Sequence, residues 1–160
     1  MKTIEITVYS FDELSDKSKE KARDNYRNNC CNEYLWWSES FDSLKTFCNK
    51  FNVKIKDYEM SHYGYSWVKT DVTHQNFRGV KLKTFDRDYM PTGYCMDCSL
   101  WITFYDAFKQ TGNALHAFNE AIDQWVKDTV TDMEDQNSDE WIDEHMICNE
   151  YEFYENGVMV

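Results

Sequence analysis

The segment from residue 113 to residue 135 places the strongest constraint on how this chain can fold. Its apolar side chains recur every three or four positions and share one arc of a helical wheel: Leu115, Phe118, Ile122, Trp125, Val126, Thr129 and Met133. The opposite arc is mostly acidic, and the side chain of Asn113 can cap the first turn. This pattern predicts a long amphipathic helix whose apolar face packs against another layer of the protein.

Spacing and capping residues predict further helices. Ser15 precedes a helix from about residue 16 to 32, with small or aromatic side chains four positions apart. A second helix from about residue 38 to 51 repeats apolar side chains at three and four positions. Ser138 can cap a short acidic helix that extends to about Ile147.

Other segments alternate with the period of two that is typical of β-strands. The alternating segments are residues 2 to 9, residues 53 to 55, the region of Trp67, residues 80 to 85, and residues 98 to 104. The pair Asn156-Gly157 favours a tight hairpin turn near the C-terminus. The expected fold class is therefore α+β, with an antiparallel sheet of about four to six strands packed against amphipathic helices.

The chain is expected to form one α+β domain over residues 1 to 160. Aromatic residues make up 17% of the sequence, a content that disordered chains do not have. A chain of this length buries roughly two-thirds of the surface that its unfolded form exposes. No internal repeat, low-complexity tract or Gly/Ser linker interrupts it.

The sequence also indicates a cytoplasmic protein. Residues 1 to 20 contain no long apolar run, and no stretch is long enough to cross a bilayer. The six cysteines are then expected to be reduced thiols rather than a disulfide framework. We expect no contact with a membrane.

Acidic residues are concentrated in one part of the chain. Residues 132 to 144 contain seven carboxylates and no Lys or Arg. Residues 120 to 155 hold thirteen acidic residues and one base, whereas the other 124 residues hold sixteen of each, so that this segment carries the whole net charge of -12. Direct binding of nucleic acid by the segment is not expected, because phosphate contacts require Lys and Arg.

Three interpretations of this acidic block remain open: a solvated helix face, a docking surface for a basic partner, or a catalytic or metal-binding cluster. On a helix, four residues advance the chain by about 6 Å, which is near the interval between successive phosphates of one strand. A face that serves only solubility normally mixes charge signs. The candidate partner-binding residues are Asp128, Asp132, Glu134, Asp135, Asp139, Glu140, Asp143 and Glu144.

The residues do not favour an enzyme or a metal protein. Cys95 and Cys98 have the spacing of a metal or redox pair, but a structural zinc site needs four ligands and no second pair exists. The four histidines are isolated, and no phosphate-binding loop or nucleophile motif occurs. We therefore assign no catalytic residue, no cofactor and no metal.

Two other features are ambiguous. Lys17, Lys19, Lys21, Arg23 and Arg27 are interleaved with acids in the predicted first helix, which favours a solvated face of exposed ion pairs. Trp36-Trp37 lies at a helix junction, where both rings cannot easily face one core, and one exposed ring would hint at a partner surface.

The segment Phe-Asp-Glu-Leu-Ser-Asp-Lys-Ser-Lys-Glu-Lys-Ala-Arg, residues 11 to 23, resembles the start of a widespread group of small acidic phage and prophage proteins. Members of this group tend to end in stretches similar to residues 139 to 144 and 149 to 153, followed by a Gly; the middle of the chain corresponds only weakly. The resemblance supplies no catalytic residue and implies an origin in a mobile element.

By analogy with that class, the expected function is anti-defence, of the anti-CRISPR or anti-restriction type. The protein would block a host defence protein by occupying its basic nucleic-acid-binding surface with an acidic surface that mimics DNA. One alternative is a non-inhibitory accessory or regulatory phage protein whose acidic face is only solvated. A small enzyme that uses carboxylates or thiols is the third possibility.

Overall fold

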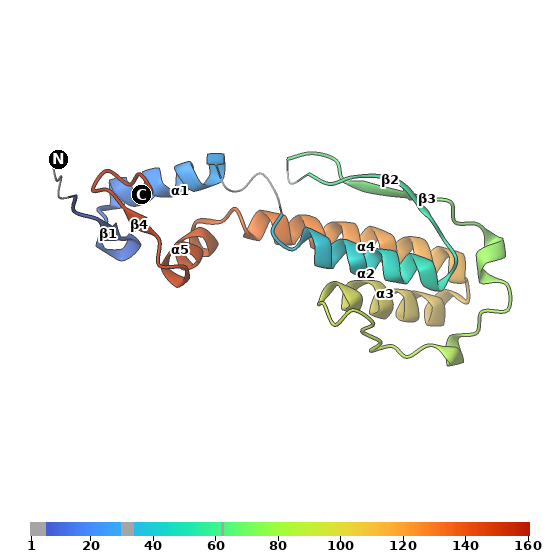
Figure 1. Ribbon diagram of the computed structural model, residues 1–160. Helices are drawn as coiled ribbons and strands as arrows, with labels where there is room; N and C mark the ends of the chain where they lie inside the picture. The colour runs from blue at the N-terminus through green and yellow to red at the C-terminus, as the bar shows by residue number, and fades with distance from the viewer. Residues whose placement is uncertain (1–5, 30–33, 62) are drawn as a thin grey trace, which may run out of the picture. The chain divides into compact units, whose positions relative to one another are not determined.

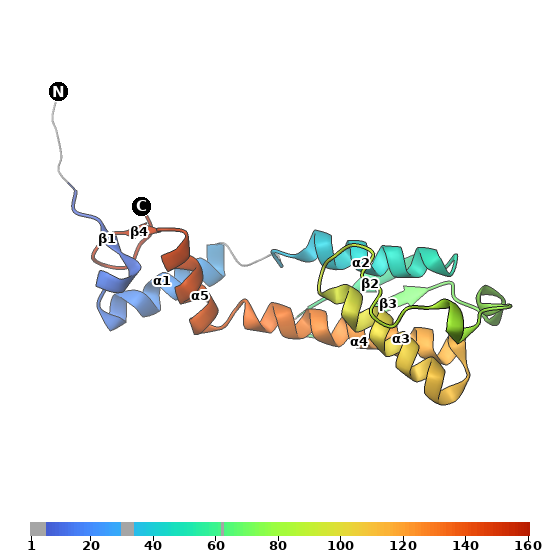
Figure 2. The ribbon, with the colours of Figure 1, turned by 90° about the horizontal axis from the view of Figure 1, so that it is seen from below.

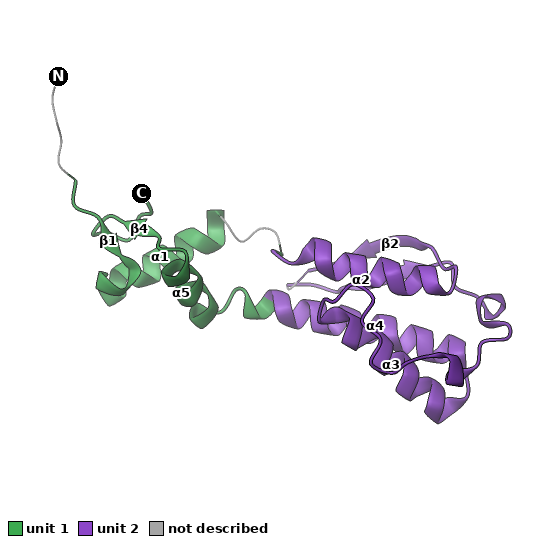
Figure 3. Ribbon diagram, turned by 60° about the horizontal axis from the view of Figure 1, so that its bottom comes forward, with its two compact units in different colours: residues 1–34, 134–160 green, residues 35–133 purple. Residues whose placement is uncertain are grey.

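The computed structural model describes residues 6–29, 34–61 and 63–160. Contacts divide the chain into two compact units, which are coloured separately in Figure 3. Unit 1 combines residues 1–34 with residues 134–160, and unit 2 contains residues 35–133. The expectation that the whole chain forms one domain stays a prediction, because a division by contacts does not measure whether the units unfold together.

The expected α+β sheet architecture is wrong. The described residues contain five α-helices and two small two-stranded sheets, and helix predominates. One sheet pairs β1 (Tyr9–Ser10) with β4 (Glu152–Phe153), and the other pairs β2 (Ile55–Glu59) with β3 (Trp67–Thr70). Both pairs are antiparallel.

Unit 2 is built on three helices: α2 (Trp37–Lys50), α3 (Met96–Thr111) and most of α4 (Ala114–Asp135). These helices lie side by side in Figures 1 and 2, and the β2–β3 hairpin packs along α2. Phe47 is fully buried at the centre, where its ring contacts the rings of Phe51, Trp101, Phe104 and Phe118. Four residues of the predicted apolar arc of α4 are buried, whereas Leu115, Val126 and Met133 are only half-buried; the buried ones are Phe118, Ile122, Trp125 and Thr129.

The segment from residue 98 to 104 is helical, although its alternating pattern predicted a strand. The buried side chains of α3 are Met96, Leu100, Trp101, Phe104 and Ala107, and their spacing is that of a helix. Cys98 and Ile102, which the alternation assigned to the same face, are only half-buried. Gly112 ends the helix at a φ of 66°, and its N–H donates to the Phe108 carbonyl over 2.9 Å.

Two other predicted strands are wrong over most of their described residues. The region of residues 80 to 85 contains the 3-10 helix η3 (Leu82–Thr84), which follows another, η2 (His74–Phe77). Of the strand predicted over residues 2 to 9, Tyr9 lies in β1, but Ile6 and Val8 are 59% and 37% exposed and belong to no strand. Residues 2 to 5 lie outside the described residues. The strands predicted near residue 55 and at Trp67 are confirmed as β2 and β3.

Unit 1 joins the two ends of the chain. It contains β1, the 3-10 helix η1 (Phe11–Glu13), α1 (Asp16–Asn29), α5 (Asp139–Cys148) and β4. The rings of Phe11 and Phe153 meet edge to face, with centroids 5.9 Å apart, and both side chains are buried. The two stretches that carry the resemblance to phage proteins thus pack against each other in one core.

The predicted turn at Asn156-Gly157 is confirmed. Gly157 has a φ of 79°, and its N–H donates to the Tyr154 carbonyl over 2.9 Å. A Cβ at this position would lie 2.1 Å from the carbonyl oxygen of Ser18, so only glycine fits. The turn is held against α1 by the Ser18 hydroxyl, which donates to the Glu155 carbonyl over 2.7 Å.

Among the described residues, no helix combines the length and the apolar character that crossing a membrane requires.

Candidate functional site

The negative charge belongs almost entirely to unit 1. This unit contains sixteen acidic and six basic residues, for a net charge of -10, whereas unit 2 contains thirteen and eleven, for a net charge of -2. The sequence located the charge in the C-terminal part of the chain, and the structure assigns most of that part to the smaller unit. The acidic residues of unit 1 are therefore the first candidate for a functional surface.

Helix α5 presents its acidic residues on two flanks. Ser138 caps the helix, because its hydroxyl accepts the Trp141 N–H over 3.2 Å, and Ile142 and Met146 are fully buried against the core of unit 1. Because Ile142 and Met146 point inward, the acidic residues of α5 fall into two pairs on the outer surface of the helix. The two members of each pair are four positions apart. Asp139 and Asp143 contact α1, whereas Glu140 and Glu144 are exposed.

The side chains of Arg23 and Arg27 on α1 bind the first of these pairs. The guanidinium of Arg23 donates two hydrogen bonds of 2.6 Å to the two carboxylate oxygens of Asp143, and it lies 3.4 Å from Asp139. Arg27 pairs with Asp139 and also donates to the Asn137 carbonyl over 3.1 Å. Because a guanidinium matches a carboxylate in shape, the Arg23–Asp143 pair fixes the orientation of α5 on α1.

These contacts shift the pKa values of Asp139 and Arg23. The hydrogen bond from Arg27 lowers the pKa of Asp139, and the nearby charge of Arg23 acts in the same direction. Hydrogen bonding to Asp143 raises the pKa of Arg23. Both shifts favour the charged pair in the folded protein.

The expectation that the basic residues of the first helix form only a solvated face is thus wrong for Arg23 and Arg27. Their side chains are 22% and 30% exposed and engaged across the unit. Asp139 and Asp143, two of the proposed partner-binding residues, have a role inside unit 1 that sequence reasoning missed. The signal that could have found it is the four-residue spacing of Arg23 and Arg27, which matches that of Asp139 and Asp143.

The other partner-binding candidates differ in exposure. Asp128 and Asp132 belong to unit 2 and are half-buried, and the carboxylate of Asp128 accepts a hydrogen bond of 2.8 Å from Gln124. The four remaining candidates lie in unit 1, are exposed and form no ion pair with a Lys or Arg of the described chain. We call them the exposed acidic set: Glu134, Asp135, Glu140 and Glu144.

A histidine lies beside this set. The ring of His145 stacks on Trp141, with centroids 4.7 Å apart, and also contacts the rings of Tyr26 and Tyr151. Burial lowers its pKa from the ordinary value, because the charged form loses hydration. The sequence offered only the four-residue spacing of Trp141 and His145 as a sign of this contact.

The Cys95–Cys98 pair lies at the start of α3. Cys95 is exposed at the N-cap position, and Cys98 is half-buried in the first turn. Between them, the fully buried Asp97 accepts three hydrogen bonds of 2.9 to 3.0 Å, from the N–H and hydroxyl of Thr92 and from the N–H of Gly93. No group of three or more His, Cys, Asp or Glu side chains in the described ranges could hold a metal ion.

The two adjacent tryptophans, Trp36 and Trp37, differ in their exposure. Trp37 packs on the core of unit 2, where its ring stacks on Phe41 with centroids 5.0 Å apart and lies 6.3 Å from the ring of Trp125. Trp36 is 48% exposed, and the neighbouring Leu35 is 50% exposed. Trp36 is therefore the exposed ring of the pair.

Comparison with known proteins adds no family to this description. No protein-family model matches the chain, and no curated protein or solved structure is detectably similar to it. The resemblance to phage proteins stays a prediction.

Proposed function

We propose that this protein is a phage-encoded anti-defence protein of the anti-CRISPR type, which binds a basic nucleic-acid-binding surface of a host protein and blocks it without turnover. The observation that carries the proposal is the net charge of -10 on unit 1. A basic channel attracts such a unit for the same reason that it attracts DNA, because opposite charges steer association. The protein would act in the host cytoplasm.

The arrangement of α5 supports a docking role. Arg23 and Arg27 bind one acidic flank of the helix, so that the other flank, with Glu140 and Glu144, is held on a fixed scaffold. Carboxylates on a fixed helix lose less conformational entropy on binding than carboxylates on a mobile tail. A purely solubilising surface requires no such support.

The docking surface must be tested without disturbing the ion pairs inside the unit. Neutralising Asp139 or Asp143 would leave Arg23 or Arg27 without its partner, and loss of inhibition would then have two explanations. The informative variant changes only the exposed acidic set: Glu134→Gln, Asp135→Asn, Glu140→Gln and Glu144→Gln.

A matched control neutralises four exposed acids of unit 2: Glu39→Gln, Asp86→Asn, Asp88→Asn and Asp123→Asn. Both variants change the net charge from -12 to -8, so a general effect of charge would be equal in the two. Circular dichroism should confirm that both variants retain the helix content of the parent.

The experiment has two stages. Plaque formation is first measured on hosts that carry single CRISPR or restriction systems, with and without the protein, to find a sensitive effector. DNA binding by that purified effector is then measured against increasing concentrations of parent, variant and control, at low and high salt.

We expect the parent and the control to displace DNA and the unit 1 variant to lose at least tenfold in potency. Inhibition by the parent should weaken as salt rises, because exposed charges are screened over about 8 Å at physiological ionic strength. Equal inhibition by the unit 1 variant would reject docking through the exposed acidic set. Failure to restore plaques on any host would reject the anti-defence function itself.

A further inference from the structure

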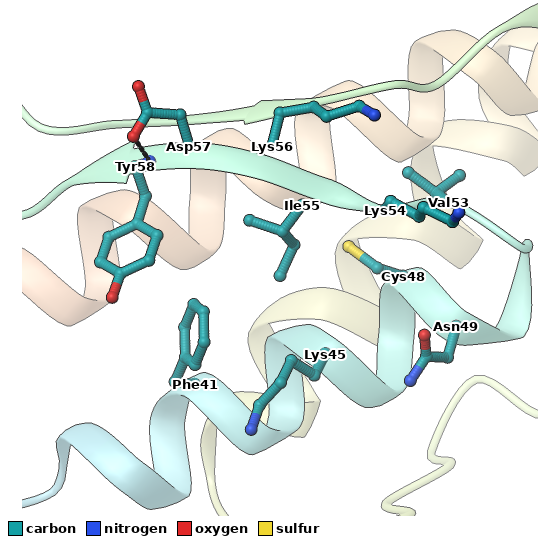
Figure 4. Close-up of a pocket in the computed structure, with 10 residues that line it drawn as sticks. All are labelled: Phe41, Lys45, Cys48, Asn49, Val53, Lys54, Ile55, Lys56, Asp57 and Tyr58. Carbon is teal, nitrogen blue, oxygen red and sulfur yellow. Dashed lines mark hydrogen bonds between the residues drawn. The ribbon is translucent and has the colours of Figure 1, made fainter.

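A groove of about 510 Å³ runs through unit 2, between α2 and the chain segment from residue 53 to 58. Figure 4 shows Phe41, Cys48 and Ile55 pointing into the space between the helix and the strand, with Tyr58 at one end and Lys54 at the other. This volume is within the range of sites that hold small molecules or peptide side chains. The groove lies outside the acidic unit and has no part in the proposed function.

One side of the groove is the free edge of a β-strand. Strand β2 pairs with β3 in a two-stranded sheet, and no other strand of the described chain pairs with either. The lining of the groove contains residues of α2 and of segment 53–58 but none of β3, so the groove opens along the other edge of β2. Such an edge presents backbone N–H and C=O groups that another extended chain can pair with.

The bottom of the groove is apolar. Val53 and Cys48 are buried, and Ile55 packs against the core of unit 2. Burial raises the pKa of the Cys48 thiol to about 12, which keeps it neutral near pH 7 and unsuited to attack a substrate. The ring centroids of Phe41 and Tyr58 lie 5.0 Å apart, and the two rings form an aromatic wall of the groove.

The charged residues of the groove are mostly basic. Lys45, Lys54 and Lys56 line it together with a single acid, Asp57, although the unit as a whole has a net charge of -2. The amine of Lys45 contacts Asp42 at 2.5 Å, and that of Lys56 lies 3.6 Å from Asp71. The amine of Lys54 forms no ion pair within the described ranges.

We propose that this groove binds an extended peptide with alternating apolar and acidic residues, which adds to β2 as a third strand. Successive side chains of a strand point to opposite faces, so alternate residues of the peptide would reach the apolar floor. The acidic residues between them would point to the opposite face, toward the exposed side chains of Lys54 and Lys56. Backbone hydrogen bonds to β2 would contribute affinity, and the groove would contribute specificity, as in other cases of strand addition.

A peptide fits these features better than a nucleic acid does. Only a polypeptide has N–H and C=O groups at the repeat needed to pair with the edge of β2. Three lysines opposed by one aspartate also supply few phosphate contacts, and nucleic-acid affinity depends on the number of such contacts.

The proposal can be tested on the full chain with a fluorescently labelled peptide of alternating glutamate and valine. A peptide of alternating lysine and valine tests the role of charge, and single-stranded oligothymidine tests the nucleic-acid alternative. Binding is followed by fluorescence anisotropy, and the site is located from NMR shifts of the amides of residues 54 to 58.

We expect the glutamate–valine peptide to bind and both alternative probes to bind at least tenfold more weakly. The double variant Lys54→Gln and Lys56→Gln should lose about tenfold in affinity for the peptide. The control Lys81→Gln and Lys109→Gln, which removes two exposed charges of the same unit outside the groove, should bind as the parent does. Equal losses in the two double variants would reject the groove as the site.

Strand addition is distinguished from simple charge attraction by N-methylation of the peptide. In a strand that pairs on one edge, alternate N–H groups face the protein. Methylating either all valine or all glutamate nitrogens should therefore abolish binding in one case and leave it nearly unchanged in the other. Absence of binding by the unmodified peptide, equal effects of the two methylation patterns, or tighter binding of oligothymidine would each overturn the proposal.

Discussion

The two units of this protein are stabilised in different ways. Unit 2 is one continuous stretch of chain, and sixteen of its described apolar residues form a buried cluster with several aromatic rings in mutual contact. The corresponding cluster of unit 1 contains seven of the residues described there. Unit 1 is also closed by contacts between the two ends of the chain, such as the Arg23–Asp143 pair, whose members are 120 positions apart.

This difference indicates how a small unit tolerates a large net charge. Burial of apolar surface contributes in proportion to area, so the core of unit 1 provides less free energy than that of unit 2. Its net charge of -10 works against compactness. The half-buried, bidentate Arg23–Asp143 pair and the more exposed Arg27–Asp139 pair between α1 and α5 offset part of this repulsion.

The largest effect is expected from Phe47→Ala in unit 2. Phe47 is fully buried, and its removal should lower the free energy of unfolding of unit 2 by about 3–5 kcal/mol, through lost burial and the cavity that remains. Urea unfolding followed by tryptophan fluorescence measures the loss. The control Leu35→Ala, at a side chain that is 50% exposed, should change stability by less than about 0.5 kcal/mol.

The same variant tests whether the units are independent. NMR signals of Ile142 and Phe153 report on unit 1, since both are fully buried in its core. Retention of these signals when unit 2 unfolds would show that unit 1 folds alone. Their loss in the same transition would show that the two units form one cooperative domain.

A smaller effect is expected from Arg23→Met in unit 1. The change removes both hydrogen bonds to Asp143 and leaves that half-buried carboxylate unpaired, at a cost of about 1–3 kcal/mol. Hydrogen exchange of α5 amides should accelerate, while amides of α2 and α4 stay protected. Lys21→Met, at an exposed base of the same helix, is the control.

The double variant Arg23→Met and Asp143→Leu should recover part of this loss, because it removes the unpaired charge together with its partner. A single variant as stable as the parent would show that the ion pair contributes nothing. The difference in stability between the two units would then depend on the size of their cores alone.

The smallest effect concerns pH. The pKa of His145 is lower in the folded protein than the ordinary value of about 6.5, so folding favours the neutral ring. This contribution to the stability of unit 1 is complete above pH 6.5 and is lost as the pH falls from 6.5 through the folded pKa. The pKa of Asp139 is also lowered in the folded protein, so its charged form contributes to the stability of unit 1. This contribution is lost only as the pH falls below about 3.8, which is more acidic than the range of His145.

His145→Phe retains a ring that can stack on Trp141 and should abolish the pH dependence of unit 1 between pH 5 and 7. Thermal unfolding measured at several pH values, with NMR titration of the His145 ring, checks this expectation. His116→Gln, at an exposed histidine of unit 2, should leave the dependence in place. A parent protein without any change in unit 1 stability over this range would contradict the assignment.

Helices α1, α2, α4 and α5 could be predicted because their determinants are close together in the chain. The apolar repeat of α4 and the cap at Asn113, whose side chain accepts the His116 N–H over 3.1 Å, involve neighbouring residues only. The cap at Ser138 and the turn at Gly157 are equally local. These features depend on backbone geometry, which is the same wherever the segment lies in the fold.

The prediction of a sheet was wrong where the same residues fitted both the period of a strand and the period of a helix. Residues 98 to 104 alternate, but Leu100, Trp101 and Phe104 also match one face of a helix. Packing against Phe47 buries this helical face, and an extended segment would place Leu100 and Trp101 on opposite sides. Tertiary burial therefore decided between two local solutions of similar quality.

Sequence alone determined the amphipathic helices, the position of the acidic residues along the chain and the C-terminal turn. Only the tertiary structure decided that Asp139 and Asp143 face Arg23 and Arg27 while Glu140 and Glu144 remain exposed, and that β2 keeps a free edge beside α2. The physical reason is the separation of the interacting residues along the chain. Periodicity and capping depend on residues within a few positions, whereas ion pairs and exposure depend on which distant segments share a core.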